Sequence, residues 1–261
     1  MISIQFINRG EDSRALVLIH AFPLSSMMYR ETASIIAERF PSLPIVLVDM
    51  PGFGNATTSA SWTMSEAMND LHAQLQDDDI TSVIIGGTSM GGYAVFAYYK
   101  LFPQECAGLI FSNTKAEADD EKAKQGREEY AQAVEKGGAV VAVEKQLDAL
   151  LGSTTKRQNT ALYEQVKDWI LATDPSAISA ALRAMAVRED STALLSTITC
   201  PTLVISAEED TVMKEEVVSA IAKAIPSSDY HRLSSTGHLS PLEVPKEWAD
   251  FVGAFINDKI I

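Results

Sequence analysis

The chain has 261 residues, of which 46% are hydrophobic and 21% are charged, and this composition excludes a disordered polymer and a disulfide-dense miniature fold. It is long enough for one large α/β domain or for a core domain with an insertion. The formal net charge of −14 at pH 7 argues against nucleic-acid and anionic-membrane partners, because both repel an acidic surface.

Short aliphatic runs alternate with stretches of helical spacing along most of the chain. The runs predict buried parallel strands at Ala15–Ile19, Ile45–Val48, Ser82–Ile85, Gly108–Phe111 and Thr202–Ile205. The spacing predicts helices at Met28–Arg39, Thr63–Gln76, Gly91–Leu101 and Glu215–Ala224. This alternation is typical of an α/β fold with a mostly parallel, doubly wound sheet, whose ligands lie at the carboxyl ends of the strands.

The alternation fails between about Lys115 and Thr197, where the sequence indicates several polar helices and no strand. We expect residues 115–197 to form a helical cap inserted into a core domain made of residues 1–114 and 198–261. The expected breaks between cap helices are Gly137–Gly138, Gly152 and Asp174–Pro175. Beyond the cap, the sequence predicts a further strand at Tyr230–Leu233 and a closing amphipathic helix from about Pro245 to Ile256.

A glycine-rich turn follows the predicted strand Ser82–Ile85. It reads Gly86-Gly87-Thr88-Ser89-Met90-Gly91-Gly92 and leads into a helix, which is the context that a GxSxG nucleophile elbow requires. Gly87 and Gly91 suit a turn tight enough to hold Ser89 in a strained conformation with its hydroxyl exposed. The alternative is a glycine turn without chemistry, but the strand and helix on its two sides favour the elbow and make Ser89 the candidate nucleophile.

A serine hydroxyl is a weak nucleophile without a base, so the elbow predicts a later histidine with an acid before it. His238 lies in a turn after the last predicted strand, and Asp210 follows the strand at residues 202–205. The order Ser89, Asp210, His238 is the order that this motif requires. Glu208 and Glu209, the neighbours of Asp210, remain alternatives for the acid.

Two backbone N–H groups are also needed to stabilise the oxyanion of a tetrahedral intermediate. Met90 supplies one because it follows the nucleophile, and we expect Phe22 to supply the other from the loop after the first predicted strand. In that loop the small Ala21 allows close approach, and Pro23 has no N–H to offer. His20 is expected to brace the loop. The predicted substrate-binding residues of the apolar pocket are Leu24, Met27, Met28 and Leu239.

The remaining histidines and cysteines have structural interpretations. His72 on a helix and His231 on an edge strand are expected to be solvated or structural residues. Cys106 and Cys200 lack metal-ligand spacing and form no CxxC motif, which predicts reduced packing residues. The sequence has no HExxH, no phosphate-binding glycine motif and no dinucleotide motif, so we expect neither a metal nor a cofactor.

The cellular setting is predicted from the first twenty residues. They carry no basic leader, and their longest apolar stretch, Ala15–Ile19, is too short for a signal segment or a membrane span. We therefore expect a soluble, cytoplasmic protein. The expected partner is a small-molecule substrate, an ester or a lactone, and neither nucleic acid nor a membrane. The protein is expected to be a monomer or a homodimer.

Taken together, four stretches resemble the alpha/beta-hydrolase superfamily over essentially the whole chain. They are His20–Pro23, Asp49–Gly54, Gly87–Gly91 and the pair of Asp210 with Gly237-His238. The resemblance implies an alpha/beta-hydrolase fold with a cap after the strand Gly108–Phe111. It also implies that Asp49 belongs to a structural turn. One departure is Ala21, where the family more often has glycine.

Within that superfamily the chain is similar to small carboxylesterases and 3-oxoadipate enol-lactone hydrolases, on the passages Asn113–Ala118 and Arg188–Thr192. An enol-lactone hydrolase needs a basic residue for its substrate's carboxylate, and Arg183 and Arg188 in the cap are candidates for it. The resemblance implies a serine hydrolase that cleaves a small ester, lactone or thioester. Open alternatives that use the same triad are C–C bond hydrolysis, amide hydrolysis and haloperoxidase-like activity. A non-catalytic ligand receptor built on a hydrolase fold is also open. A haloalkane dehalogenase would need a carboxylate in place of Ser89.

Overall fold

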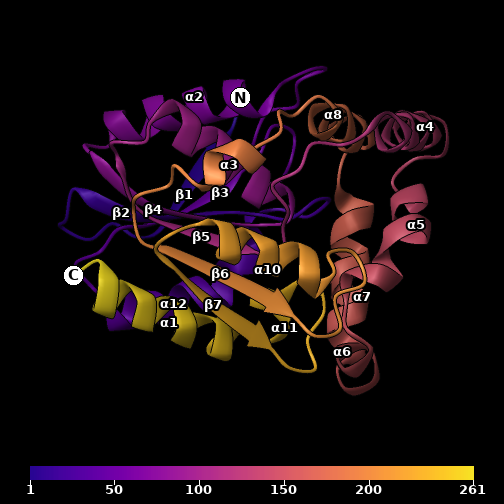
Figure 1. Ribbon diagram of the computed structural model, residues 1–261. Coiled ribbons are helices and arrows are strands. Elements are labelled where there is room, and N and C mark those ends of the chain that lie inside the picture. Colours follow the sequence, from indigo (N-terminus) through magenta and orange to yellow (C-terminus); the bar gives the residue numbers. More distant parts are fainter.

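A seven-stranded sheet forms the centre of the computed structural model, which describes residues 1–261 (Figure 1). Its strand order is β1-β3-β2-β4-β5-β6-β7, and every neighbouring pair is parallel except β1 with β3. The predicted α/β fold with a mostly parallel sheet is thus confirmed. The strands are β1 Ser3–Asn8, β2 Arg14–Ile19, β3 Ile45–Asp49, β4 Ser82–Thr88, β5 Cys106–Ser112, β6 Thr202–Ala207 and β7 Ser228–Leu233.

The strands from β2 to β6 are almost entirely buried, which explains why the sequence shows them as continuous aliphatic runs. Helices cover both faces of the sheet (Figure 1). On one face α1 (Arg30–Arg39) packs against α12 (Pro245–Lys259), and on the other α2 (Met64–Asp77) packs against α3 (Met90–Leu101). Helix α10 (Glu215–Ala224) packs on β6.

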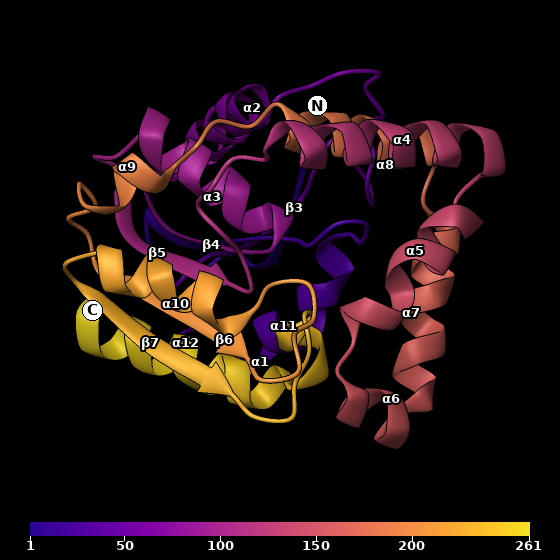
Figure 2. The ribbon, with the colours of Figure 1, turned by 45° about the vertical axis from the view of Figure 1, so that its right-hand side comes forward.

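Residues 115–197, which the sequence predicts to form a cap and which are called the cap below, lie between β5 and β6 in the chain. Figures 1 and 2 show α4 to α8 beyond the edge of the sheet toward which the arrowheads of β6 and β7 point, whereas Figure 2 shows the short α9 on the opposite side. Within it α4 packs along α8, and α5 packs along α7. Its helices are α4 Glu121–Gly137, α5 Val140–Leu150, α6 Ser153–Gln158, α7 Thr160–Ala172, α8 Pro175–Ala186 and α9 Thr192–Leu195.

Local signals explain where several helices begin and end. Thr63 and Glu66 form a capping box at the start of α2, each side chain accepting from the other residue's backbone N–H. Helix α8 begins at Pro175, and the side chain of Asp174 accepts the N–H of Ser176. The cap helices break at the glycines and at the proline that the sequence indicated.

Two elements differ from the prediction. Strand β1 was not predicted, because it is a half-buried antiparallel edge strand whose polar and apolar residues alternate, unlike the aliphatic runs of the parallel strands. The helix expected from Met28 begins at Arg30, after the 3-10 turn Ser26–Tyr29. None of the helices combines the length and the hydrophobicity needed to cross a lipid bilayer.

Candidate active site

The turn after β4 holds Ser89 in an unusual backbone conformation. Ser89 has φ 54° and ψ −112° and directly precedes α3. Glycines on both sides make the turn possible, since a Cβ on Gly87 would lie 2.2 Å from the carbonyl carbon of Gly91. A Cβ on Gly91 would lie 2.0 Å from the carbonyl oxygen of Ile19 in β2. A non-glycine residue at positive φ stores strain that the surroundings must enforce, and such residues cluster at functional sites.

The neighbouring strand end fixes the backbone of Ser89. Its N–H donates to the carbonyl oxygen of Ser112 at 3.0 Å, and the Thr114 hydroxyl donates to the Ser89 carbonyl oxygen at 2.8 Å. The Ser89 residue is 9% exposed, and its hydroxyl makes no hydrogen bond within the protein. The backbone is therefore rigid while the hydroxyl remains available to a reacting partner.

His238 and Asp210 meet in the interior beside this turn. His238 Nδ1 lies 2.8 Å from Asp210 Oδ2, and both side chains are at most 1% exposed. The backbone N–H groups of Val212 and Met213 donate to Asp210 Oδ1 at 2.8 and 2.9 Å. Burial alone raises the pKa of the Asp210 carboxyl, but His238 and the donated hydrogen bonds lower it below its ordinary value. Asp210 therefore remains an acceptor for the imidazole.

The two acidic neighbours of Asp210 make other contacts. Glu208 accepts from Arg232 at 3.0 Å and from the Ser235 N–H at 2.9 Å. Glu209 accepts both the backbone N–H and the hydroxyl of Thr154 in the cap at 2.7 Å. Neither glutamate forms a hydrogen bond or an ion pair with His238, so the geometry favours Asp210 as its partner.

Ser89, Asp210 and His238 follow β4, β6 and β7, whose carboxyl ends lie at the same edge of the sheet. The structure joins His238 to Asp210 but shows no hydrogen bond between the Ser89 hydroxyl and His238. In ligand-free enzymes such bonds are often long and tighten only when the substrate is bound.

The loop after β2 carries the predicted second oxyanion donor. His20 Nε2 accepts the Met50 N–H at 3.0 Å, so its proton lies on Nδ1, which faces the Ala21 carbonyl oxygen at 3.0 Å. Burial lowers the pKa of His20, in keeping with a neutral ring that braces the loop. The Phe22 N–H has no partner in the protein, and Met90 opens α3, where N–H groups have no partner within the helix.

Asn113 is a site residue that the sequence did not reveal. It follows β5 with φ 48° and is fully buried. Its amide donates to Asp210 Oδ2 at 2.8 Å, while its carbonyl oxygen accepts from the hydroxyls of Ser240 and Ser112 at 2.7 and 3.0 Å. An asparagine directly after a buried strand was the available signal, because asparagine tolerates this conformation.

The residues predicted to bind substrate occupy mixed positions. Leu24, Met28 and Leu239 are at most 1% exposed and pack in the core, whereas Met27 is 38% exposed. Their contact with a substrate stays a prediction. The cap does reach the oxyanion loop, since the Tyr130 ring on α4 meets the Phe22 ring edge-on with centroids 6.4 Å apart.

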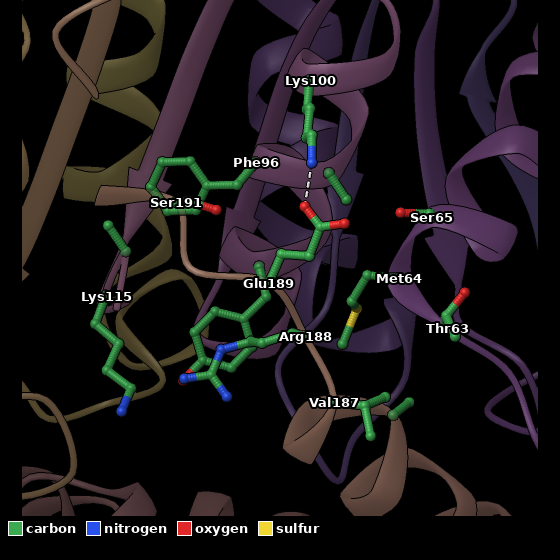
Figure 3. A pocket seen from close by; sticks show the side chains of 14 residues that line it. Thr63, Met64, Ser65, Phe96, Lys100, Lys115, Val187, Arg188, Glu189 and Ser191 are labelled. Carbon is green, nitrogen blue, oxygen red and sulfur yellow. Dashed lines mark hydrogen bonds and ion pairs between the residues drawn. The ribbon is translucent and has the colours of Figure 1, made fainter. Parts of the chain in front are cut away.

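A separate pocket of about 200 Å³ lies between the start of α2, one face of α3 and the chain after α8 (Figure 3). Figure 3 shows the ion pair of Lys100 with Glu189 on one side, and Lys115 and Arg188 near the other. Ser89, Asp210 and His238 are not among its lining residues. With no nucleophile and base side by side, this pocket does not explain the chemistry that the sheet edge offers.

The two arginines proposed for an anionic substrate are already engaged. Arg183 pairs with Glu128 and Glu135 on the cap surface. Arg188 donates to Asp119 and to the carbonyl oxygens of Glu117 and Met185. Both therefore serve the cap's own structure.

Known proteins share this sequence pattern and this fold. The sequence model of the alpha/beta hydrolase fold family matches residues 14–245. The chain is 23% identical to Lipase 3 of Moraxella sp. (strain TA144), over 95% of this chain and 79% of the lipase. A thermophilic esterase from Thermogutta terrifontis superposes with a TM-score of 0.94 at 28% identity, over 100% of this chain and 94% of the esterase. An enol-lactonase from Burkholderia xenovorans LB400 shares the fold, with a TM-score of 0.88 at 16% identity over 98% of this chain and 96% of the lactonase.

Proposed function

The chain belongs to the alpha/beta hydrolase fold family, and we propose that it is a serine hydrolase that cleaves a small ester, lactone or thioester through an acyl-enzyme on Ser89. One observation carries the proposal: the strained Ser89 turn and the buried Asp210–His238 pair lie at the same edge of the sheet. A nucleophile, a base and an acid that orients the base are the parts that acyl transfer requires.

In the proposed reaction, His238 Nε2 takes the hydroxyl proton of Ser89 as the serine oxygen attacks the substrate's carbonyl carbon. The carbonyl oxygen becomes an oxyanion, which the N–H groups of Phe22 and Met90 stabilise. His238 then gives the proton to the departing alcohol or thiol, and the acyl group remains on Ser89. Water attacks the acyl-enzyme with its proton passing to His238, which releases the acid and returns the proton to Ser89.

Asp210 and Asn113 prepare the base for these steps. Asp210 holds the proton of His238 on Nδ1, which leaves Nε2 free to accept from Ser89, and it stabilises the imidazolium that forms. Asn113 donates to the same Asp210 oxygen that faces the imidazole, and its own carbonyl is fixed by two serine hydroxyls. We assign Asn113 as a positioning residue because it acts through Asp210.

The substrate class rests on the surroundings and on the similar proteins. The esterase that is 28% identical supports ester cleavage for this chain. The aromatic rings of Phe22 and Tyr130 lie beside the proposed oxyanion site and favour a substrate with an apolar part. Arg183 and Arg188 are bound within the cap, so no carboxylate on the substrate is needed to explain them.

A substrate panel tests the proposed function. We expect the wild type to hydrolyse p-nitrophenyl esters of short to medium acyl chains, with simple lactones and acyl thioesters as the second and third arms. Ser89→Ala should lower kcat by about a thousandfold or more, because covalent catalysis is lost. A folded Ser89→Ala variant with wild-type turnover would contradict the proposal, as would a wild type inert toward all three substrate classes.

A further inference from the structure

The carboxylate of Glu243 contacts the backbone on both sides of His238, the candidate base, within the same loop. It ends the short helix α11 (Ser240–Glu243), and its carboxylate turns back toward the preceding residues. Oε2 accepts the N–H of Gly237 at 3.1 Å, and Oε1 accepts the N–H of Leu239 at 3.2 Å. These are the two residues on either side of His238, so one carboxylate fixes the backbone that carries the imidazole.

The same carboxylate also reaches the cap. Oε2 accepts the N–H of Gly152 at 2.9 Å and the hydroxyl of Thr155 at 2.6 Å. Gly152 and Gly237 touch directly, since a Cβ on Gly237 would lie 2.1 Å from the Gly152 nitrogen. The Leu150 carbonyl oxygen accepts the Leu239 N–H at 3.2 Å and closes the contact. The junction between α5 and α6 therefore rests directly on the His238 loop.

No arginine or lysine forms an ion pair with this half-buried carboxylate, and all four of its hydrogen-bond donors are uncharged. Burial raises the pKa of Glu243, and the hydrogen bonds from Thr155, Gly152, Gly237 and Leu239 act against that rise. A carboxylate that only accepts matches four donors, whereas a neutral amide would set its NH₂ group against one of them. An apolar residue would stabilise this contact at lower cost, so a half-buried glutamate here points to a role in orientation.

We propose that Glu243 is a positioning residue that acts through His238. It holds the His238 imidazole in the position from which it can accept the Ser89 proton, and this position depends on the contact with the cap's α5–α6 junction. The inference rests on the proposed function, because it concerns the efficiency of the same base. At this point the cap therefore helps to position the His238 imidazole.

Glu209 offers a matched control. It also joins the cap to the loop that carries Asp210, because its carboxylate accepts the Thr154 N–H and hydroxyl, but that carboxylate makes no hydrogen bond to the two residues that flank His238. Glu209→Gln thus weakens a similar carboxylate contact between cap and core without touching the residues that flank His238. Thr155→Val is the second variant, since it removes only one cap contact of Glu243.

The test compares kcat and KM of these variants on one p-nitrophenyl ester, together with the low-field proton resonance of the His238 Nδ1–H in the full-length chain. We expect Glu243→Gln to lower kcat about a hundredfold with KM within about threefold, because a small displacement of a catalytic group costs that much. The resonance should move or broaden in Glu243→Gln and stay in place in Glu209→Gln, and Thr155→Val should show the same changes to a smaller degree.

Two outcomes separate the inference from the function beneath it. If the wild type hydrolyses the ester and folded Glu243→Gln keeps its kcat and its resonance, the positioning role is wrong while the hydrolase assignment stands. If the wild type hydrolyses nothing, the function fails, and the resonance still shows whether Glu243 orients His238. Should Glu243→Gln not fold, an unchanged kcat and resonance in Thr155→Val would overturn the link to the cap.

Discussion

Two carboxylates, Asp119 within the cap and Glu243 at the contact between cap and core, are held by different kinds of partner. In the stem, which consists of cap residues 115–120 and 187–191, Asp119 is 2% exposed and surrounded by cations. Arg188 donates to it at 2.8 Å, Lys115 lies at 3.2 Å, and Arg127 pairs with its other oxygen. At the distal junction, where residues 150–155 meet residues 237–243, Glu243 accepts only from uncharged groups.

The difference appears in the pKa directions. Burial alone raises the pKa of Asp119, but the hydrogen bonds and charges of Arg188 and Arg127 bring it well below its usual range. Burial raises the pKa of Glu243, and no cation reverses the rise. A cation at the distal junction would lie near His238 and would oppose the imidazolium of the proposed reaction. The stem is therefore expected to contribute to stability, whereas the proposed role of the distal junction is to orient the His238 imidazole.

The largest expected effect comes from breaking the stem. Asp119→Asn leaves two arginines without their counter-charge in a buried site, and losing one partner of such a network costs about 3–5 kcal/mol of unfolding free energy. Chemical denaturation measures the loss. The folded fraction should keep kcat within about threefold, because Asp119 touches none of the triad.

The surface pair of Arg183 with Glu128 supplies the control for that prediction. Both side chains are about two-fifths exposed, so Glu128→Gln should cost less than about 1 kcal/mol. If Asp119→Asn is no more destabilised than Glu128→Gln, the stem is not the stabilising attachment and the contrast with the distal junction is lost.

The next effect tests whether His238, the residue that the distal junction holds, acts as the base with Asp210 as its acid. Asp210→Asn replaces the carboxylate that faces His238 Nδ1 with an amide, which favours the wrong tautomer. Turnover should fall by at least about a hundredfold with the fold intact. Steady-state kinetics measures the turnover, and circular dichroism checks the fold. A folded Asp210→Asn variant with nearly full turnover would show that another residue orients His238.

Acid should act on the two attachments with opposite signs. The folded pKa of Asp119 is lowered, so its stabilisation is present above the unfolded carboxyl pKa and is lost as pH falls through the folded value. The folded pKa of Glu243 is raised, so the folded state gains stability as pH falls through that value toward the unfolded one. The stability advantage of wild type over Asp119→Asn should therefore shrink on acidification, and its advantage over Glu243→Gln should grow. Denaturation curves across the acid range that change in the same direction would refute the contrast.

The smallest expected effect concerns the acidic neighbours of Asp210. Glu208 bonds Arg232 and the Ser235 N–H, and Glu209 bonds Thr154, so neither orients His238. Glu208→Gln and Glu209→Gln should each change turnover by less than about tenfold. A much larger loss of turnover in either variant would show that this glutamate, and not Asp210, is the acid that orients His238.

Much of this arrangement could be predicted from the sequence because its signals are local. The elbow around Ser89 is a glycine pattern within seven residues, and the continuous aliphatic runs mark strands buried on both faces. The helical segment between β5 and β6 was predicted because strand-like runs stop where its helices begin. Strand β1 was missed because an alternating edge strand of six residues gives a weak signal.

Other residues could not be predicted because their partners are distant along the chain. Asn113 meets Asp210 across 97 positions, and Glu243 meets Gly152 across 91. Both work through backbone or amide contacts, which leave no spacing pattern in a single sequence. Likewise Arg183 and Arg188 were open candidates for substrate binding until the structure showed Glu128 and Asp119 beside them.

Covalent labelling tests the central claim most directly. A fluorophosphonate reacts with a serine that a base has activated, so incubation of the full-length chain followed by mass mapping of peptides should find one adduct, on Ser89. Ser89→Ala should remain unlabelled, and Glu243→Gln should label more slowly than Glu209→Gln. An adduct on another serine, or none in the folded protein, would contradict the assignment of Ser89 as the nucleophile.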